Sequence, residues 1–160
     1  MPVDFTRHLW LSCNKRRRAA QAHDIQKGTI ISQPSDETRQ REQGDRFMPK
    51  FDAAGLLTAV AIDHRTGQIL MLAHMNREAI DKTLETGFAH FHSRSRGRLW
   101  MKGESSGHVL AVKEIRVDCD QDAIELRVEP HGPACHTMAQ TCFYRKLTPD
   151  GRLERVDAPA

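Results

Sequence analysis

The sequence has no apolar run long enough to cross a membrane. A spanning helix needs roughly 18 or more consecutive apolar residues, and no stretch of the 160-residue chain comes near that length. The short segment HLWLSC near the start is followed by its basic residues, whereas a secretory signal peptide has them in front. We therefore expect a soluble cytoplasmic protein with no membrane partner.

Several cysteine and histidine signatures are also missing. The chain has four cysteines, but no two have the C-x₂-C spacing of a zinc finger. The H-x-E and P-C-x-x-C signatures of zinc-dependent nucleobase deaminases are absent as well. In a chain without an export signal, cysteines more often serve as metal ligands or buried thiols than as disulfides.

Net positive charge is confined to the N-terminal third of the chain. Residues 1–50 hold 10 Lys and Arg against 6 Asp and Glu, a net charge of +4, whereas residues 51–160 hold 14 against 15, a net charge of −1. Residues 1–45 also lack sustained periodicity, which is typical of a poorly ordered extension. We expect one domain over residues 46–148, followed by a C-terminal tail over residues 149–160.

Hydrophobic periodicity in that domain predicts a mainly β, α+β fold with one main helix. Alternating or apolar runs indicate strands at residues 56–62, 69–75, 88–93, 99–103, 109–117, 123–128 and 142–147. The segment 76–87 reads as a helix, with Asn76 as its N-cap and Gly87 just after its end. With only 39% hydrophobic residues the core is thin, which favours a dimer that shares it.

Acidic residues gather between two of these strands, in the stretch IRVDCDQDAIELRV. The apolar parity changes across it, which predicts a turn that brings Asp118, Asp120 and Asp122 to one side and turns Cys119 away. Three close carboxylates need a cation or raised pKa values, and oxygen ligands suit Mg²⁺. The alternative is an acidic hairpin tip in open water.

Three cysteines of the domain are far apart in sequence: Cys119, Cys135 and Cys142. They are either buried, inert thiols or ligands of one zinc ion. Three thiolates without a fourth protein ligand would leave an open position for water, as in catalytic zinc sites. His136 follows Cys135 directly and is placed to act there as a general acid or base.

A basic loop, HSRSRGRLWMKGESSG, lies between two strands. Its arginine forks, serine hydroxyls and glycine amides match phosphate groups, and Trp100 offers a face on which a base can stack. The same residues would serve RNA binding or form a solvated charged hairpin. If the loop binds a phosphorylated substrate, the candidate binding residues are Arg94, Arg96, Trp100, Lys102, Glu104, Ser105 and Ser106.

Taken together, these motifs resemble the phosphoribosyl-AMP cyclohydrolase family of histidine biosynthesis. The matching segments are MLAHMNREAIDKTLETG, HFHSRSRGRLWMKGESSG, VKEIRVDCDQDA and ACHT…CFYR, in order over residues 48–147. After CHT the family usually has a glycine and then basic residues, where this chain has Met138, Ala139, Gln140 and Thr141.

The resemblance implies hydrolytic opening of the C6–N1 bond in the adenine ring of 1-(5-phosphoribosyl)-AMP by a zinc-activated water. It implies an intertwined homodimer with a shared zinc site, in which one subunit supplies Cys119 and its partner supplies Cys135 and Cys142. It also implies Mg²⁺ on Asp118, Asp120 and Asp122. The pyrophosphohydrolase domain that follows in some relatives is expected to be absent.

Two other functions are compatible with parts of the pattern. A nucleobase deaminase would attack the same carbon but release ammonia, and its signatures are missing. A zinc-stabilised RNA-binding module would use the basic loop and bind in a salt-sensitive way. The near-neutral charge of residues 51–160 favours a small phosphorylated nucleotide over nucleic acid as the partner.

Overall fold

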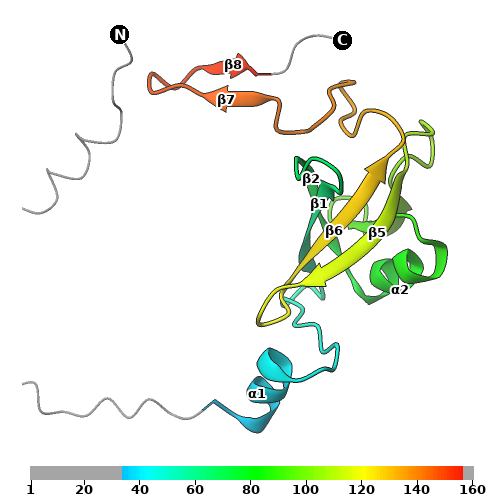
Figure 1. The fold of residues 1–160 in the computed structure, drawn as a ribbon, viewed down its shortest axis with the longest axis vertical. Coiled ribbons are helices and arrows are strands. Elements are labelled where there is room, and N and C mark those ends of the chain that lie inside the picture. The colour runs from blue at the N-terminus through cyan, green and yellow to red at the C-terminus, as the bar shows by residue number, and fades with distance from the viewer. Residues whose placement is uncertain (1–33, 157–160) are drawn as a thin grey trace, which may run out of the picture. The chain divides into compact units, whose positions relative to one another are not determined.

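Six strands form one sheet in a computed structural model that describes residues 34–156 (Figure 1). In spatial order they run β4-β3-β2-β1-β6-β5, all neighbours being antiparallel except β1 and β6. The bounds are β1 Leu57–Asp63, β2 Ile69–Met75, β3 His90–Ser93, β4 Arg98–Met101, β5 Leu110–Val117 and β6 Ala123–Pro130. The described residues also form two helices, α1 Asp36–Gln43 and α2 Arg77–Thr86. A separate hairpin consists of β7 Arg145–Leu147 and β8 Leu153–Arg155. The prediction of a mainly β fold with one main helix is confirmed.

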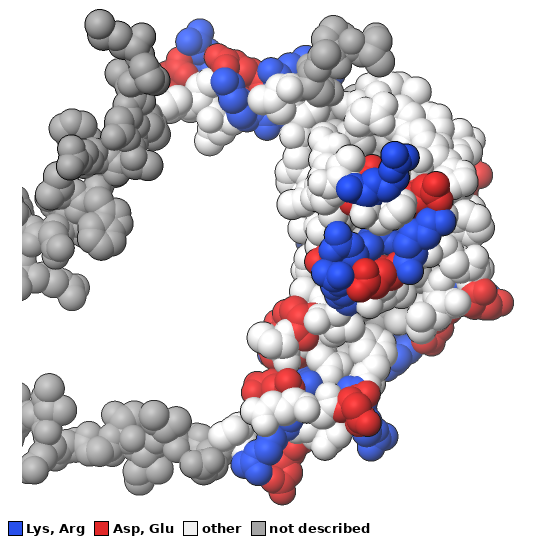
Figure 2. Space-filling model, viewed as in Figure 1, with Lys and Arg blue, Asp and Glu red and all other residues white. Residues whose placement is uncertain are grey.

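Strand β6 shows how the sequence period becomes a buried and an exposed face. Ile124, Leu126 and Val128 are buried, and charged residues alternate with them. On the exposed side of β5 and β6, acidic and basic side chains interleave (Figure 2). They form ion pairs across and along the two strands: Lys113–Glu129, Arg116–Glu114 and Arg127–Glu125.

The sheet curls until its edge strand β5 meets the segment that leads into β3. The amide of Ala89 donates to the carbonyl of Leu110 at 3.0 Å, and the amide of Val112 donates to the carbonyl of Gly87 at 2.7 Å. The concave side encloses a core in which Phe91 and Leu110 are fully buried. Because the curl brings the end of β4 near the start of β5, the loops at that end of the sheet can share one site.

Helix α2 forms where the sequence predicts it. The Asn76 side chain accepts a hydrogen bond from the amide of Ala79 at 2.9 Å, and Gly87 takes a left-handed φ of 74° after the last turn. One face buries Ala79, Ile80 and Thr83 against the sheet. The buried Thr83 hydroxyl donates to the carbonyl of Ala79 and accepts from the amide of His90, which fixes the helix to β3.

Regular structure extends beyond both expected domain boundaries. Helix α1 lies within residues 1–45, where we expected a poorly ordered extension, and β8 lies within the expected tail of residues 149–160. Ser35 caps α1 by accepting from the amide of Thr38 at 3.1 Å, and β7 supplies β8 with a partner. Residues 1–33 and 157–160 lie outside the described residues. Neither helix of the described part is long and apolar enough to span a bilayer.

Replacing Ile80 by alanine tests the packing of α2 against the sheet. Ile80 is 2% exposed, so its truncation should lower the free energy of unfolding by about 2–4 kcal/mol. Asp81→Ala on the exposed side of the helix should change it by no more than about 0.5 kcal/mol. Urea denaturation measures both, and equal effects of the two variants would contradict the assigned packing.

Candidate functional site

A cavity of about 450 Å³ opens where the ends of β2 and β4 meet two loops. The first loop connects β4 to β5, and the second follows β6 and carries two cysteines. Nine of the residues predicted to act in catalysis, substrate binding or zinc binding line this cavity: Arg96, Trp100, Lys102, Glu104, Ser105, Ser106, Cys135, His136 and Cys142. The fold thus brings together residues that are up to 46 positions apart in the sequence.

The cysteine loop is fixed to strand β2 by hydrogen bonds. The amide of Cys142 donates to the carbonyl of Leu70 at 2.7 Å, and the buried Thr141 hydroxyl donates to the carbonyl of Ile69 at 2.6 Å. A second bond, from the amide of Cys135 to the carbonyl of Ala139 at 3.1 Å, closes the loop on itself. Both thiols are therefore held at the cavity by backbone contacts.

The pKa values of the two thiols shift in opposite directions, because burial dominates at Cys142 and hydrogen bonds dominate at Cys135. Burial opposes ionisation of Cys135, but hydrogen bonds from the Thr137 hydroxyl at 3.1 Å, from backbone amides and from the Cys142 thiol together lower its pKa. The Cys142 side chain reaches solvent, yet the protein atoms around its sulfur and the neighbouring Cys135 raise its pKa to about 11. Two neighbouring sulfurs are a donor pair that a soft divalent cation such as Zn²⁺ would fully deprotonate.

Lys102 places a positive charge beside this pair. Its ammonium group donates to the carbonyl of His108 at 3.0 Å, within the β4–β5 loop. Burial lowers its pKa, while the nearby sulfurs of Cys142 and Cys135 act in the opposite direction. The cavity therefore combines a cation with two ionisable sulfurs.

His136 and Met138 follow Cys135 around the turn of the cysteine loop. The His136 Nδ1 atom lies 3.9 Å from the Cys135 sulfur, and the imidazole is exposed to the cavity. Met138 has a left-handed φ of 67° at the position where the family resemblance led us to expect glycine. Since glycine adopts this conformation freely, methionine here costs roughly 1 kcal/mol of backbone strain.

His108 also lines the cavity, although sequence reasoning gave it no role. Two glycines make room for it. A Cβ atom on Gly103 would lie 2.4 Å from the His108 backbone, and one on Gly132 would lie 2.7 Å from the His108 ring. The spacing of glycines around the β4–β5 loop was the only sequence signal that pointed to His108. The contact with Gly132 exists only in the folded chain.

The residues of the basic loop do not all reach the cavity. Arg96 reaches the cavity, whereas Arg94 is not among its lining residues. The Trp100 ring packs against Phe91 with ring centroids 5.3 Å apart, so part of it belongs to the core. Glu104 accepts a hydrogen bond from the amide of Met101 at 3.2 Å, which orders the start of the loop.

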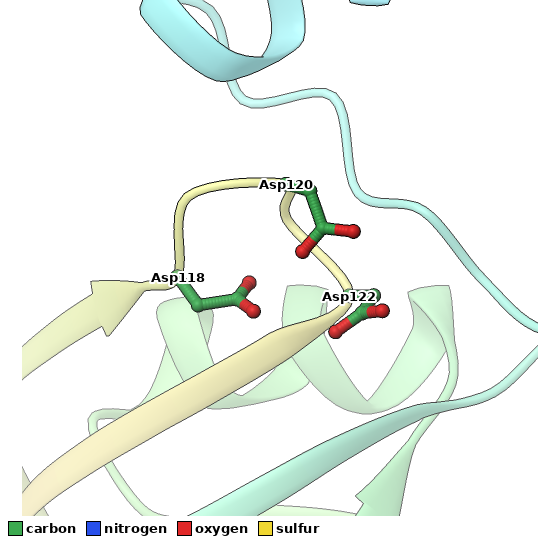
Figure 3. Close-up of side chains that lie close together, drawn as sticks. All are labelled: Asp118, Asp120 and Asp122. Carbon is green, nitrogen blue, oxygen red and sulfur yellow. The ribbon is translucent and has the colours of Figure 1, made fainter. Parts of the chain in front are cut away.

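The acidic turn lies at the opposite end of the β5–β6 hairpin. One carboxylate oxygen from each of Asp118, Asp120 and Asp122 lies within 4.8 Å of the others, and the three side chains face a common space (Figure 3). The Asp118 carboxylate also accepts from the amide of Ala123 at 3.1 Å, which closes the turn. This set of oxygen donors is of the type that Mg²⁺ binds.

A lysine already supplies positive charge to these carboxylates. The Lys50 ammonium lies 2.6 Å from an oxygen of Asp120 and 3.9 Å from one of Asp122. The hydrogen bond from Lys50 holds the pKa of Asp120 below its ordinary value, and the same bond raises the pKa of Lys50. The convergence of carboxylates thus creates a position that favours a cation.

Cys119 does not join the other two cysteines within this chain. Among residues 34–156, the converging groups of three or more potential metal ligands include the aspartates but not the cysteines. Cys119 instead lines a separate cavity of about 400 Å³ beside α1, with Arg41 and Phe47. The eight residues of β6 put roughly 25 Å between the two ends of the hairpin.

Adding a methyl group to Gly132 tests the glycine contact that positions His108. Gly132 has a φ of 116° and its new Cβ would meet the imidazole, so Gly132→Ala should lower the free energy of unfolding by about 1–3 kcal/mol and shift the NMR signals of the His108 ring. Gly67→Ala is the control, because Gly67 has a φ of 75° with no atom in reach of its Cβ. Unchanged His108 signals in Gly132→Ala would show that the contact does not position the ring.

Comparison with known proteins covers the cysteines of the domain, the basic loop and the acidic turn. A model of the phosphoribosyl-AMP cyclohydrolase family matches residues 71–144. The phosphoribosyl-AMP cyclohydrolase of Rhizorhabdus wittichii is 66% identical over 111 residues, which are 69% of this chain and 90% of the relative. That of Rhodopseudomonas palustris is 63% identical over 121 residues, 73% and 82% of the two chains. That of Brucella suis is 54% identical over 122 residues, 75% and 87%. With this identity over most of both chains, and with thiols and carboxylates at the two ends of one hairpin, the chain belongs to the phosphoribosyl-AMP cyclohydrolase family.

Proposed function

We propose that the protein hydrolyses the C6–N1 bond in the adenine ring of 1-(5-phosphoribosyl)-AMP, as a step of histidine biosynthesis. Membership of a family whose relatives carry the name of this activity supports the reaction class. The observation that carries the proposal is the cavity itself, where two thiols, an imidazole and a basic loop converge. A direct test is to follow the ultraviolet change as the ring of phosphoribosyl-AMP opens. Substrate left intact by the metal-loaded protein would contradict the proposal.

Cys135 and Cys142 are the donors that would hold Zn²⁺ in this cavity. Their sulfurs interact with each other, and the Cys142 side chain still reaches solvent, so an ion between them would stay accessible to water. Zn²⁺ supplies the Lewis acidity that makes water a nucleophile at neutral pH. The donor set within one chain is incomplete, and Cys119 of a second subunit is the proposed third ligand.

His136 is proposed to move the protons of the reaction. The ribosyl group on N1 leaves C6 electron-poor, so a water oxygen adds there and the C6–N1 bond then breaks to leave a carboxamide. The water oxygen loses both of its protons on the way to the carboxamide. The first is transferred to N1, and the second goes to the exocyclic nitrogen on C6 or to solvent. The His136 imidazole is exposed to the cavity beside Cys135, where it can take the first proton and return it to the leaving nitrogen.

The two phosphate groups of the substrate account for the remaining residues. A molecule with two phosphate monoesters carries roughly four negative charges near neutral pH. Arg96, Lys102 and the Ser105–Ser106 loop are available for one phosphate within the cavity, with Arg94 on the adjoining turn. Mg²⁺ held by Asp118, Asp120 and Asp122 is proposed to bind the other. Trp100 packs on Phe91, which favours a role as a wall of the cavity.

An intertwined homodimer is the proposed assembly. Every residue of strands β7 and β8 is exposed, including Leu147 and Leu153, which are 72% and 55% exposed. An isolated two-stranded hairpin is only marginally stable in water, so a second copy is the expected cover. The same partner would bring Cys119 to the two thiols of this chain.

The other two functions receive less support. On the face shown in Figure 2, basic side chains over β5 and β6 are interleaved with acidic ones rather than forming a continuous basic surface. This arrangement disfavours an RNA-binding module.

A deaminase would release ammonia during turnover, whereas ring opening releases none, so an ammonia assay separates the two reactions. We expect the enzyme to act in the cytoplasm.

Replacing Cys135 by alanine tests the zinc site. The variant should lose its bound zinc. Its turnover should fall by more than roughly 100-fold, which is the cost of losing an outer-shell partner of a metal ligand. Cys13→Ala is the matched control, since Cys13 lies outside the described residues and has no proposed role. Zinc content by atomic spectroscopy and the ultraviolet assay measure the two effects. Normal zinc and activity in Cys135→Ala would refute the assignment.

Replacing Asp120 by asparagine tests the magnesium site separately. Losing one of three carboxylate charges should raise the Mg²⁺ concentration that gives half-maximal activity, by roughly ten-fold. The zinc content should stay the same, because Asp120 is not one of the three proposed zinc ligands. Asp81→Asn, on the exposed side of α2, is the control. A magnesium titration that Asp120→Asn leaves unchanged would count against this site.

A further inference from the structure

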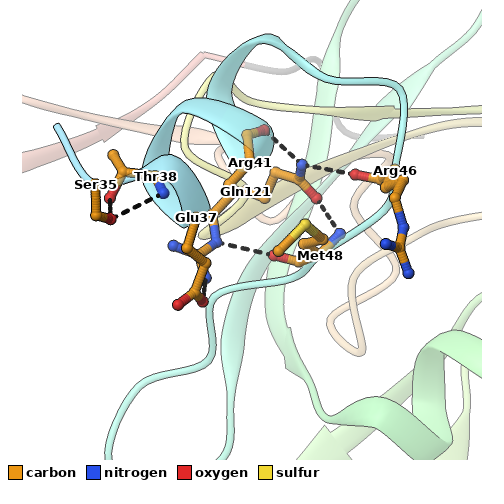
Figure 4. Close-up of polar contacts among 7 residues, drawn as sticks. All are labelled: Ser35, Glu37, Thr38, Arg41, Arg46, Met48 and Gln121. Carbon is orange, nitrogen blue, oxygen red and sulfur yellow. Dashed lines mark hydrogen bonds and ion pairs between the residues drawn. The ribbon is translucent and has the colours of Figure 1, made fainter.

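Gln121, in the middle of the acidic turn, is joined to the segment before β1 by a set of hydrogen bonds (Figure 4). We call residues 34–50 the strap. The Gln121 side-chain amide donates to the carbonyls of Arg41 at 2.7 Å and Arg46 at 3.1 Å, and it accepts from the amide of Met48 at 2.6 Å. The Gln121 backbone carbonyl accepts from the amide of Lys50 at 2.8 Å. Two segments more than 70 residues apart are thus linked through one residue.

The conformation of Gln121 depends on these bonds. The residue is only 7% exposed and has a φ of 60°, which is an unfavourable backbone conformation for glutamine. A buried amide that loses its partners is costly, so its three side-chain bonds to the strap favour this arrangement strongly. Gln121 lies between Asp120 and Asp122, and its own amide donates to the carbonyl of Asp118 at 3.3 Å. Any change in its position would therefore move the carboxylates.

Besides these bonds, the strap contacts α2, where the Arg77 guanidinium lies 5.7 Å from the centre of the Phe47 ring. Helix α1 has eight residues and buries none of them, and isolated helices of this length are marginal in water. Arg41 adds two bonds within the strap, from its Nε to the carbonyl of Met48 at 3.1 Å and from its guanidinium to the carboxylate of Glu37 at 2.8 Å. At its end, the Lys50 ammonium reaches the carboxylates of Asp120 and Asp122. The order of the strap and the geometry of the acidic turn are therefore coupled.

We propose that Gln121 is a positioning residue, which uses the strap to hold Asp118, Asp120 and Asp122 in the arrangement that binds a divalent cation. The inference rests on the magnesium site of the proposed function and assigns a role to a segment outside the catalytic cavity. Coupling of this kind is reciprocal. A cation bound to the turn should stabilise the strap, and release of the strap should weaken binding of the cation.

The test uses the full chain, Mn²⁺ as the probe and no nucleotide. Gln121→Met removes the three side-chain hydrogen bonds while keeping an unbranched side chain of similar size. The matched control is Arg46→Ala, because Gln121 contacts the carbonyl of Arg46 and not its side chain. Mn²⁺ affinity is measured by electron paramagnetic resonance, and Asp120→Asn identifies the binding that belongs to the turn. Hydrogen exchange of the Met48 amide reports the strap.

The proposal makes two linked predictions for these variants. Gln121→Met should weaken Mn²⁺ binding roughly 10- to 100-fold, the range found when an outer-shell partner of a metal ligand is lost, and Arg46→Ala should bind as the wild type does. Saturating Mn²⁺ should slow exchange of the Met48 amide in the wild type but not in Gln121→Met. A merely structural role for Gln121 would lower stability without changing Mn²⁺ affinity at a temperature where both proteins are folded.

Two results would overturn the proposal. One is wild-type Mn²⁺ affinity in Gln121→Met although its strap exchanges freely. The other is that Asp120→Asn leaves all Mn²⁺ binding of the wild-type chain in place, which would show that the acidic turn binds no ion. Because no substrate is present, a protein that fails to open phosphoribosyl-AMP would still give a decisive result here, so failure of the reaction and failure of the coupling are distinguishable.

Discussion

The length of the β5–β6 hairpin is the constraint on which the whole arrangement depends. Cys119 lies in the turn at one end of it, and Cys135 follows the strand that ends at the other. Strands of this length separate the two ends by roughly 25 Å, so the three cysteines of one chain cannot share an ion. A common zinc site therefore requires two chains, and the exposed β7–β8 hairpin gives a second copy a surface to cover.

The same separation keeps two types of potential metal ligand apart within one chain. Sulfur ligands, which suit Zn²⁺, lie at the cavity, and carboxylates, which suit Mg²⁺, lie at the turn. Each anionic group has its own lysine: Lys102 lies near the sulfurs of Cys135 and Cys142, and Lys50 contacts Asp120. These lysines offset charge that would otherwise accumulate in a chain without bound metals. The protein thus holds two thiols at one end of the hairpin and three carboxylates at the other.

Local sequence patterns predicted the elements of this fold but not the contacts between them. The period-2 strands, the caps at Asn76 and Gly87, and the turn between β5 and β6 all follow from residues close together in the chain. Helix α1 was missed because it has no buried face of its own and is joined to the acidic turn through Gln121, some 80 positions away. His108 was missed for the same reason, since its contact with Gly132 exists only in the folded chain.

Mixing two inactive variants tests the shared zinc site most directly. Cys119→Ala and Cys135→Ala are each expected to be inactive as homodimers. When the two chains are unfolded and refolded together, half of the dimers should be mixed, and each mixed dimer should regain one complete site, so about a quarter of the wild-type activity returns for a two-fold symmetric dimer. No recovery, in a mixture shown to contain mixed dimers, would place all three cysteines of each site in one chain and contradict the account.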